Sequence, residues 1–263
     1  PADWIAKAKK EKFLRIGGTW DEGQFPTMIK PFQERWPWLT IKYDRSSRHD
    51  RVIKPLMAYQ SGRIIADIIS GVGAKYALFE QLKANDDMTV LPNWKNIPKG
   101  MRAEDGGWVG NRLRYWCMSY NTNNVKKADL PKKWEDLITN KRWHNQKVGM
   151  GNRPNLWLIM LWAAKGEDWV KAYSRDIFTT LKPQLRKEGM NALVGLTVAG
   201  EFDASVPSAG YRIYQQALKG APIGFHCPEP VPLSVSEMVM IKGSDRKHRA
   251  LIFLNWFLSR EGQ

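Results

Sequence analysis

The residues best suited to bind a charged molecule form the run Gly151-Asn152-Arg153-Pro154-Asn155. This run joins a strand expected in KVGM to a helix expected in PNLWLIMLWAAKG. The start of a helix attracts anions, and an arginine can hold a carboxylate or phosphate through two parallel hydrogen bonds. We therefore expect Asn152, Arg153 and Asn155 to contact an anionic ligand. The alternative is a helix-capping Asn152 beside a surface arginine.

Small polar residues follow three further strands, which we expect in FLRIGG, LTIKY and IADIISGVG. Ligands of parallel α/β sheets bind outside the carboxyl ends of the strands. The candidate ligand-binding residues at these ends are Thr19, Trp20, Ser46, Ser47, Ser70 and Gly71. Ordinary turn formation would also explain these residue types.

A fourth candidate region is GEFDASVPSAGYRIYQQALKGAP. It predicts a strand near residues 203–206, a turn at Pro207-Ser208, and a helix with Ser208 as its N-cap. The hydroxyl groups of Ser208 and Tyr211 are therefore further candidate ligand donors.

Signatures of catalysis and of metal binding are missing from the sequence. No P-loop and no G-x-S-x-G motif occur, and the four histidines lack the spacing of zinc ligands: His49, His144, His226 and His248. We expect no catalytic residue, no metal site and no cofactor.

Composition gives broader limits. The chain has 263 residues and a formal net charge of +15, with the basic residues spread along it. This spread favours a solvated surface over a nucleic-acid interface, although it could also favour contact with an anionic membrane. No apolar run is long enough to span a membrane, and the first residues read as a mature N-terminus whose export signal has been removed.

Strands alternate with helices along the chain, which predicts an α/β fold with a mostly parallel sheet. Further helices are expected near residues 167–180 and 190–199. The last helix should be amphipathic, with one buried face made of Ala250, Phe253, Leu254, Phe257 and Leu258.

Residues 115–150 carry a family resemblance. The matching positions are Tyr120, Asn121, Thr122, Asp129, Leu130, Pro131, Trp134, Glu135, Asp136, Leu137, Trp143 and Lys147. Their order is similar to that in bacterial ABC-importer solute-binding proteins of the ferric-ion-binding type. Gly200-Glu201-Phe202, Gly220-Ala221-Pro222 and residues 253–263 resemble later landmarks of the family, whose members normally continue beyond the final Gly-Gln.

This resemblance implies a two-lobed periplasmic-binding-protein fold of type II, closing by hinge bending on a ligand between the lobes. We expect a first lobe of residues 1–114 and 228–263, and a second lobe of residues 115–227. The function implied is capture of a solute in the periplasm for an ABC permease. The run at residues 151–155 makes a small, anionic organic solute the expected ligand. We expect a monomer without enzymatic activity or nucleic-acid partner.

The sequence leaves room for functions besides capture of an organic solute. Ferric-binding relatives use two adjacent tyrosines, whereas only Tyr211 falls on that pattern here, with Tyr214 one turn further along. Iron binding is therefore disfavoured. The same fold would also suit the ligand-sensing domain of a regulator, or an enzyme.

Two cysteines, Cys117 and Cys227, fit neither a zinc site nor a Cys-x-x-Cys redox pair. Both would lie on crossover segments between the lobes. A disulfide and a pair of buried thiols are both compatible with the sequence.

Overall fold

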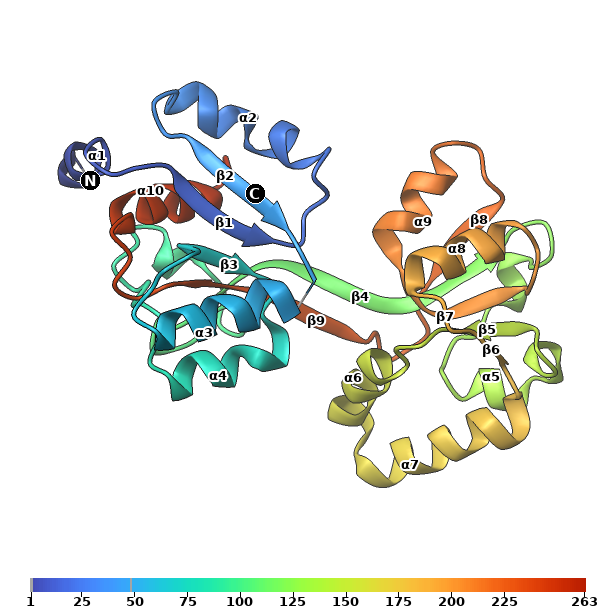
Figure 1. Ribbon diagram of the computed structural model, residues 1–263. Coiled ribbons are helices and arrows are strands. Elements are labelled where there is room, and N and C mark those ends of the chain that lie inside the picture. The colour runs from blue at the N-terminus through green and yellow to red at the C-terminus, as the bar shows by residue number, and fades with distance from the viewer. Residues whose placement is uncertain (1, 48) are drawn as a thin grey trace. The chain divides into compact units, whose positions relative to one another are not determined.

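The computed structural model describes residues 2–47 and 49–263. The chain divides into two compact units. Unit 1 comprises Pro1–Leu113 and Val235–Gln263, and unit 2 comprises Arg114–Ser234. The chain passes between the units along two strands, β4 (Val109–Asn121) and β9 (Leu233–Met240) (Figure 1).

Unit 1 contains a sheet in which β1 (Leu14–Gly18) lies between two parallel neighbours, β2 (Ile41–Arg45) and β3 (Ile68–Ser70). Strand β9 pairs antiparallel with β3. The α-helices of this unit are α1 (Ala2–Ala8), α2 (Phe25–Arg35), α3 (Lys54–Gln60), α4 (Tyr76–Gln81) and α10 (Lys247–Phe257). Shorter turns are a π-helical turn at His49–Ile53 and 3₁₀ turns at Gly73–Lys75 and Trp94–Asn96.

Both faces of this sheet are buried. Successive strand residues point to opposite faces, so Ile68 and Met240 join the core formed with α2 and α10. Ile69 and Val239 join a second core, formed with α3 and α4. Coverage on both sides explains why all three residues of β3 are buried, whereas β2 alternates apolar and charged residues and has no fully buried residue.

Helix α10 departs from the expected amphipathic pattern. Ala250, Phe253, Leu254 and Phe257 of the predicted face are buried, and Leu258, directly after the helix, is partly buried. Outside that face, Leu251, Ile252 and Trp256 are buried as well. The reason is α1, which packs against α10 and removes a second side from solvent. Arg249 is part of this contact, since its Nε donates to the carbonyl of Ala8 at 3.0 Å.

Unit 2 contains a mixed sheet in which β4 pairs antiparallel with β7 (Ala204–Ala209) and β8 (Ile223–His226), while β5 (Val148–Met150) runs parallel to β7 and β6 (Gln184–Leu185). Its α-helices are α5 (Asp136–Thr139), α6 (Asn155–Lys165), α7 (Glu167–Asp176), α8 (Met190–Val198) and α9 (Gly210–Ala217). Shorter turns lie at Lys127–Asp129, Lys141–Trp143 and Ile177–Leu181.

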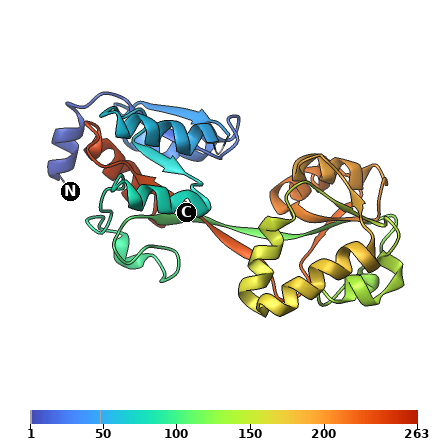
Figure 2. The ribbon, with the colours of Figure 1, turned by 60° about the horizontal axis from the view of Figure 1, so that its bottom comes forward.

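Helices cover both faces of the sheet in unit 2, with α6 and α7 on one face and α8 and α9 on the other (Figures 1 and 2). The face under α6 and α7 is apolar, and its core includes Trp134, Trp143 and Trp157, all fully buried. The opposite face carries Ser119 and Ser205, which are also fully buried. The alternation along β4 and β7 thus separates an apolar face from a hydroxyl-bearing one.

A disulfide joins Cys117 of β4 to Cys227, directly after β8, with a Cα–Cα distance of 4.8 Å. The sequence left this pairing open, and the structure resolves it. Because β4 and β8 are hydrogen-bonded neighbours, the bond lies within unit 2 and links residues 110 positions apart. Such bonds are typical of proteins outside the reducing cytosol.

Candidate functional site

In unit 1, the predicted residues gather at one edge of the sheet. Strands β1, β2 and β3 are parallel, so their carboxyl ends meet there. Thr19 follows β1, Ser46 and Ser47 follow β2, and Ser70-Gly71 ends β3. We call this the unit 1 edge.

Arg51 joins these strand ends, although it was not among the residues predicted from the sequence. The side chain is only 6% exposed. Its Nη1 donates to the carbonyl of Ser46 at 2.6 Å, and its Nη2 donates to the carbonyl of Gly71 at 3.1 Å. A Cβ placed on Gly17 would lie 3.3 Å from Cγ of Arg51, so the arginine also packs against β1. Its position in a polar turn gave no signal of these long-range partners.

Most other polar groups at the unit 1 edge also form hydrogen bonds within the unit, although the Ser46 hydroxyl and Oδ1 of Asn111 have no partner among the described residues. Arg112 of β4 donates from Nη2 to the hydroxyl of Thr19. Asn111 donates from Nδ2 to the hydroxyl of Ser70 at 2.6 Å, and Ser47 donates to Asp50 at 2.7 Å. Most side chains at this edge are therefore already hydrogen-bonded to one another, so their positions are fixed before any ligand binds.

Trp20 is the predicted pocket residue, and its side chain is only 8% exposed. Its ring lies 5.6 Å from that of Phe257 and 5.8 Å from that of Phe25, centroid to centroid. Burial raises the pKa of the neighbouring Tyr43 to about 12, and the Tyr43 hydroxyl donates to the Trp20 carbonyl. Trp20 is thus part of an aromatic core cluster, and a ligand contact through it stays a prediction.

In unit 2, strands β5 and β7 are parallel, so their carboxyl ends also share one edge. Helix α6 follows β5 and α9 follows β7. Helix α8 begins at the same edge, because a Cβ on Gly151, directly after β5, would lie 2.7 Å from Cδ1 of Leu193 in its first turn. We call this the unit 2 edge.

Neither α6 nor α8 has a side chain that caps its first turn. The residue before α6 is Pro154 and the residue before α8 is Gly189. Asn152 therefore does not cap α6, which excludes the capping role considered from the sequence. The first N–H groups of an uncapped helix have no acceptor inside the helix and favour an anion.

Two polar contacts connect the segments of the unit 2 edge. Asn152 donates from Nδ2 to the carbonyl of Lys187 at 2.8 Å, which links the end of β5 to the segment before α8. Tyr211 donates from its hydroxyl to Oδ1 of Asn191 at 3.0 Å, which links α9 to α8. Tyr211 nevertheless stays 57% exposed. The structure thus brings Asn152 and Tyr211 to the same edge.

Arg153 is exposed at this edge, as is Asn155. Within residues 2–47 and 49–263, no hydrogen bond, ion pair or ring contact engages the Arg153 guanidinium. The nearby carboxylate of Glu188 is held by Arg186, with 3.2 Å between Nη2 and Oε1. Hydrogen bonds from its own backbone and from Arg186 lower the pKa of Glu188, so this acid is charged but already paired. Arg153 is left as a positive group available to a ligand.

Ser208 lies at a different kind of position from the one expected. The predicted turn and N-cap are wrong, because β7 continues through Pro207 and Ser208, and α9 begins at Gly210. The Val206–Pro207 peptide bond is cis. A contact between Ser208 and a ligand stays a prediction.

The Ser208 hydroxyl belongs to a cluster of four buried hydroxyl groups with Ser119, Thr197 and Ser205. Ser119 and Ser205 are 2.6 Å apart, oxygen to oxygen, and Ser208 is 2.9 Å from Ser205. Thr197 of α8 lies 3.2 Å from Ser119 and donates to Ser205 at 3.1 Å, which anchors α8 on the sheet. The cluster thus holds β4, β7 and α8 together next to the unit 2 edge.

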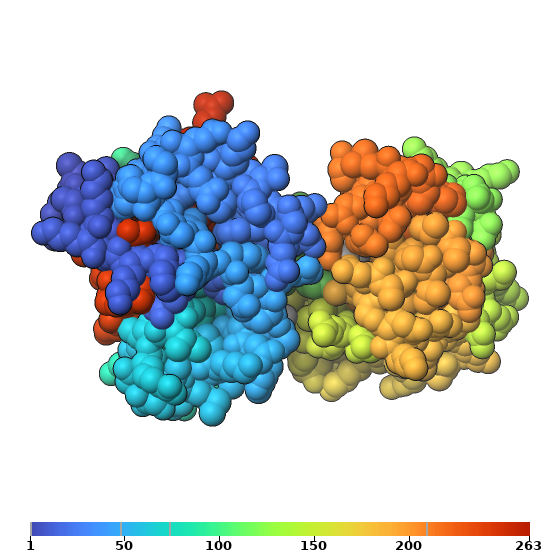
Figure 3. All heavy atoms as spheres, turned by 45° about the horizontal axis from the view of Figure 1, so that its top comes forward, coloured from blue at the N-terminus to red at the C-terminus, as the bar shows by residue number. Residues whose placement is uncertain are grey.

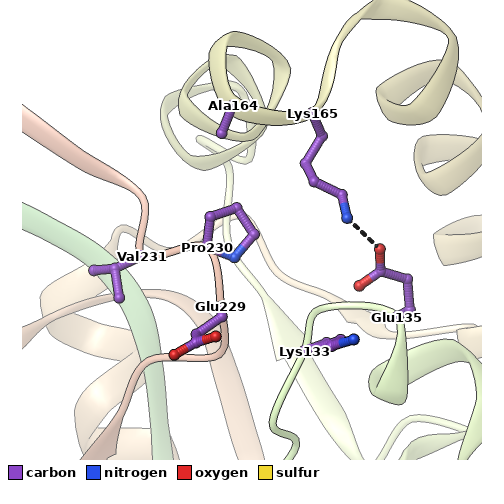
Figure 4. Close-up of a pocket in the computed structure, with 7 residues that line it drawn as sticks. All are labelled: Lys133, Glu135, Ala164, Lys165, Glu229, Pro230 and Val231. Atoms are coloured by element: carbon purple, nitrogen blue, oxygen red, sulfur yellow. Dashed lines mark ion pairs between the residues drawn. The ribbon is translucent and has the colours of Figure 1, made fainter.

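Each unit also has a surface hollow. The hollow in unit 2 has a volume of about 790 Å³ and is lined by Lys133, Glu135, Ala164, Lys165, Glu229, Pro230 and Val231 (Figure 4). The Lys165–Glu135 ion pair in this hollow measures 2.9 Å, and none of the predicted site residues lines it. The hollow in unit 1 has a volume of about 480 Å³ and includes Ser46 and Arg51.

No cluster of three or more His, Cys, Asp or Glu side chains suited to a metal ion occurs in the described part of the chain. The tyrosines considered for iron, Tyr211 and Tyr214, are 57% and 66% exposed on α9. Among the described helices, none is both long and apolar enough to cross a membrane.

Solved structures similar to this chain share its two-lobed type II periplasmic-binding-protein fold. Iron-bound HitA from Pseudomonas aeruginosa has a TM-score of 0.76 and 16% identity, covering 95% of this chain and 82% of HitA. AfuA from Actinobacillus pleuropneumoniae, with fructose-6-phosphate bound, has a TM-score of 0.73 and 18% identity, covering 95% and 81%. An ABC transporter substrate-binding protein from Bradyrhizobium japonicum has a TM-score of 0.79 and 18% identity, covering 95% and 79%.

The sequence comparisons give the family. No curated protein sequence matches this chain significantly. Residues 51–263, however, match the sequence model of the bacterial extracellular solute-binding proteins. These are periplasmic, substrate-binding components of ABC transport systems. The chain therefore belongs to the family of bacterial extracellular solute-binding proteins.

Proposed function

We propose that this protein captures a small organic anion in the periplasm and delivers it to an ABC permease. The observation that carries this proposal is Arg153, an exposed guanidinium without a partner in the described chain, placed where the uncapped helices α6 and α8 begin. A guanidinium holds a carboxylate or phosphate bidentately, and the helix starts add N–H donors.

The ligand-binding set at the unit 2 edge is Asn152, Arg153, Asn155 and Tyr211. Unit 1 would contribute Thr19, Ser46, Ser47, Ser70 and Gly71. Capture by hinge bending, in a monomer and without turnover of the solute, is part of this proposal. The hydrogen-bonded polar groups of unit 1 support capture of a solute, because a site that is already ordered loses less entropy when the ligand binds.

Ferric ion is the second candidate, because HitA binds iron and shares the fold at 16% identity. Tyr211 offers one phenol at the unit 2 edge, with its hydroxyl already donated to Asn191. Hard ferric ion prefers several oxygen ligands. An arginine beside this edge disfavours a bare cation and favours an anion, which supports the organic solute over the metal.

Isothermal titration calorimetry with citrate, fructose 6-phosphate and inorganic phosphate tests the proposal. We expect at least one organic anion to bind, and Arg153→Ala to weaken its binding by about 30- to 1,000-fold. Arg175→Ala is the matched control, because Arg175 is exposed in α7, in the same unit, and is not part of the edge. This control should leave the Kd unchanged.

Three results would contradict the proposal in different ways. Equal affinities of Arg153→Ala and the wild type for the bound anion would remove Arg153 as the anchor. Tight binding of ferric ion that Tyr211→Phe abolishes would favour the iron candidate. Steady consumption of the solute by purified protein would show an enzyme.

A further inference from the structure

A strongly basic surface lies on unit 2, on the segment that follows β4. Its six lysine side chains are exposed, and we call them the basic surface: Lys126, Lys127, Lys132, Lys133, Lys141 and Lys147. None of the six forms an ion pair with any residue that the structure describes. Residues 122–147 lie at the surface of this unit, as the green to yellow-green spheres in Figure 3 show.

Short hydrogen bonds hold this segment together. Arg142 donates from Nη2 to the carbonyl of Asn124 at 2.8 Å, which brings the turn at Lys141–Trp143 next to the one at Lys127–Asp129. The backbone N–H groups of Lys132 and Lys133 both donate to Oδ2 of Asp136, at 2.8 and 3.0 Å. The lysines are therefore presented by an ordered scaffold, not by a loose loop.

The acids of the segment do not neutralise the lysines. Asp136 is occupied by the two backbone N–H groups. Glu135 accepts from Lys165 at 2.9 Å and from Nε1 of Trp169 at 2.8 Å, and both partners come from outside the segment. These two carboxylates are thus used for folding. The third acid of the segment, Asp129, is exposed and forms no ion pair with the described residues, so the six lysines outnumber the one free carboxylate.

We propose that the basic surface binds an anionic phospholipid membrane. Its cations are lysines, which act as mobile point charges and suit a diffuse layer of headgroups, whereas defined phosphates are more often held by arginine forks. A basic segment next to a membrane is attracted to anionic lipids, with a contribution from each lysine that nears the surface.

Other macromolecules fit this surface less well. The segment's aromatic rings, Trp134 and Trp143, are fully buried, so they offer no stacking platform for a single-stranded nucleic acid. None of the exposed large apolar side chains of the described chain lies between residues 122 and 147, so the surface lacks the apolar centre of a typical protein interface. The family acts outside the cytoplasm, where the membrane that holds the permease is the adjacent anionic surface.

Vesicle co-sedimentation of the whole protein tests this inference, with phosphatidylcholine vesicles compared with phosphatidylcholine–phosphatidylglycerol vesicles. The test variant replaces Lys126, Lys127, Lys132 and Lys133 by Gln. The control variant also replaces four exposed lysines by Gln, at Lys83, Lys95, Lys99 and Lys242 of unit 1, which form no ion pair with the described residues. Both variants therefore have the same net charge.

We expect the wild type to bind only the vesicles that contain phosphatidylglycerol, and to be released by high salt. The test variant should bind about 30-fold more weakly, and the control variant less than about 3-fold more weakly. Thermal unfolding checks that both variants fold. Failure of the wild type to bind at low salt, or equal losses in the two variants, would overturn the inference. The assay contains no solute, so its outcome is independent of the anion-capture proposal.

Discussion

The unit 1 edge and the unit 2 edge are both formed by the carboxyl ends of parallel strands. They differ in whether their polar side chains are hydrogen-bonded within the unit or exposed. At the unit 1 edge, parallel strands end in small polar residues that mostly hydrogen-bond within the unit, with the buried Arg51 joining two of the strand ends. At the unit 2 edge, parallel strands lead into helices without side-chain caps, and Arg153 stays exposed and unpaired within the described chain. One arginine stabilises an edge, and the other is available to a ligand.

This difference shows that residue type and strand-end position do not by themselves define a binding group. Arg51 and Arg153 both follow short strands and both lie among small polar residues. What separates them is burial and the presence of nearby carbonyl acceptors. A buried charged side chain that donates to carbonyls of its own unit contributes to the free energy of folding, and an exposed one without partners can contribute to the free energy of binding.

The largest expected effect concerns the disulfide, which only unit 2 possesses. Replacing both Cys117 and Cys227 by Ala should lower the free energy of unfolding of unit 2 by about 4 kcal/mol, because the bond closes a long loop in the unfolded chain. Denaturant unfolding should then show unit 2 melting before unit 1.

Reduction of the wild type with dithiothreitol is the matching control, and it should reproduce the early transition. An unchanged unfolding curve in the double variant would mean that the stability of unit 2 does not depend on the disulfide. The two units would then be more alike in stability than we infer.

The next effect compares the same substitution at the two edges. Arg51→Met should lower the free energy of unfolding by about 3 kcal/mol, because it leaves the carbonyls of Ser46 and Gly71 without their donor. Arg153→Met should change it by less than about 0.5 kcal/mol, because an exposed side chain without partners is removed. Urea unfolding monitored by tryptophan fluorescence gives both values. Similar losses of unfolding free energy in the two variants would contradict the inference that only Arg51 stabilises its edge.

The smallest effect compares hydroxyl groups. Ser70→Ala should cost about 2 kcal/mol, because Asn111 loses its buried acceptor while its own Oδ1 already has no partner in the described chain. Tyr211→Phe should cost less than about 0.5 kcal/mol, because the hydroxyl lost is exposed. Thermal unfolding is sensitive enough to rank the two. A larger loss in Tyr211→Phe would show that the contact between α8 and α9 is structural.

The order of elements could be predicted from sequence because strands and helices have different apolar periods. The ends of β1, β2 and β3 and the start of α6 fall where the apolar runs meet Gly, Ser, Asn and Pro. Contacts between positions distant in the chain could not be predicted. Trp20 follows β1, as expected, and it also packs on Phe257, which lies near the other end of the sequence.

The candidate site was predictable only in part, for the same physical reason. Arg153 and Tyr211 could be proposed from the sequence because turns and helix starts are local signals, and their contact with a ligand stays a prediction. Arg51 was missed because its partners are backbone carbonyls, which every residue carries and no sequence pattern marks. Ser208 was misplaced because a Pro-Ser pair is typical of a turn, whereas β7 continues through it by pairing with Cys117 of β4, which is distant in the chain.

The path of the chain through β4 and β9 has a consequence for biosynthesis. Unit 2 is one continuous stretch, Arg114–Ser234, so it can fold as soon as that stretch is available. Unit 1 has to wait for the last segment, because β9 pairs with β3 and α10 supplies Phe253 and Leu254 to its core. The part of the protein that begins first during synthesis is therefore completed last, and a chain interrupted before residue 235 would hold a finished unit 2 beside an unfinished unit 1.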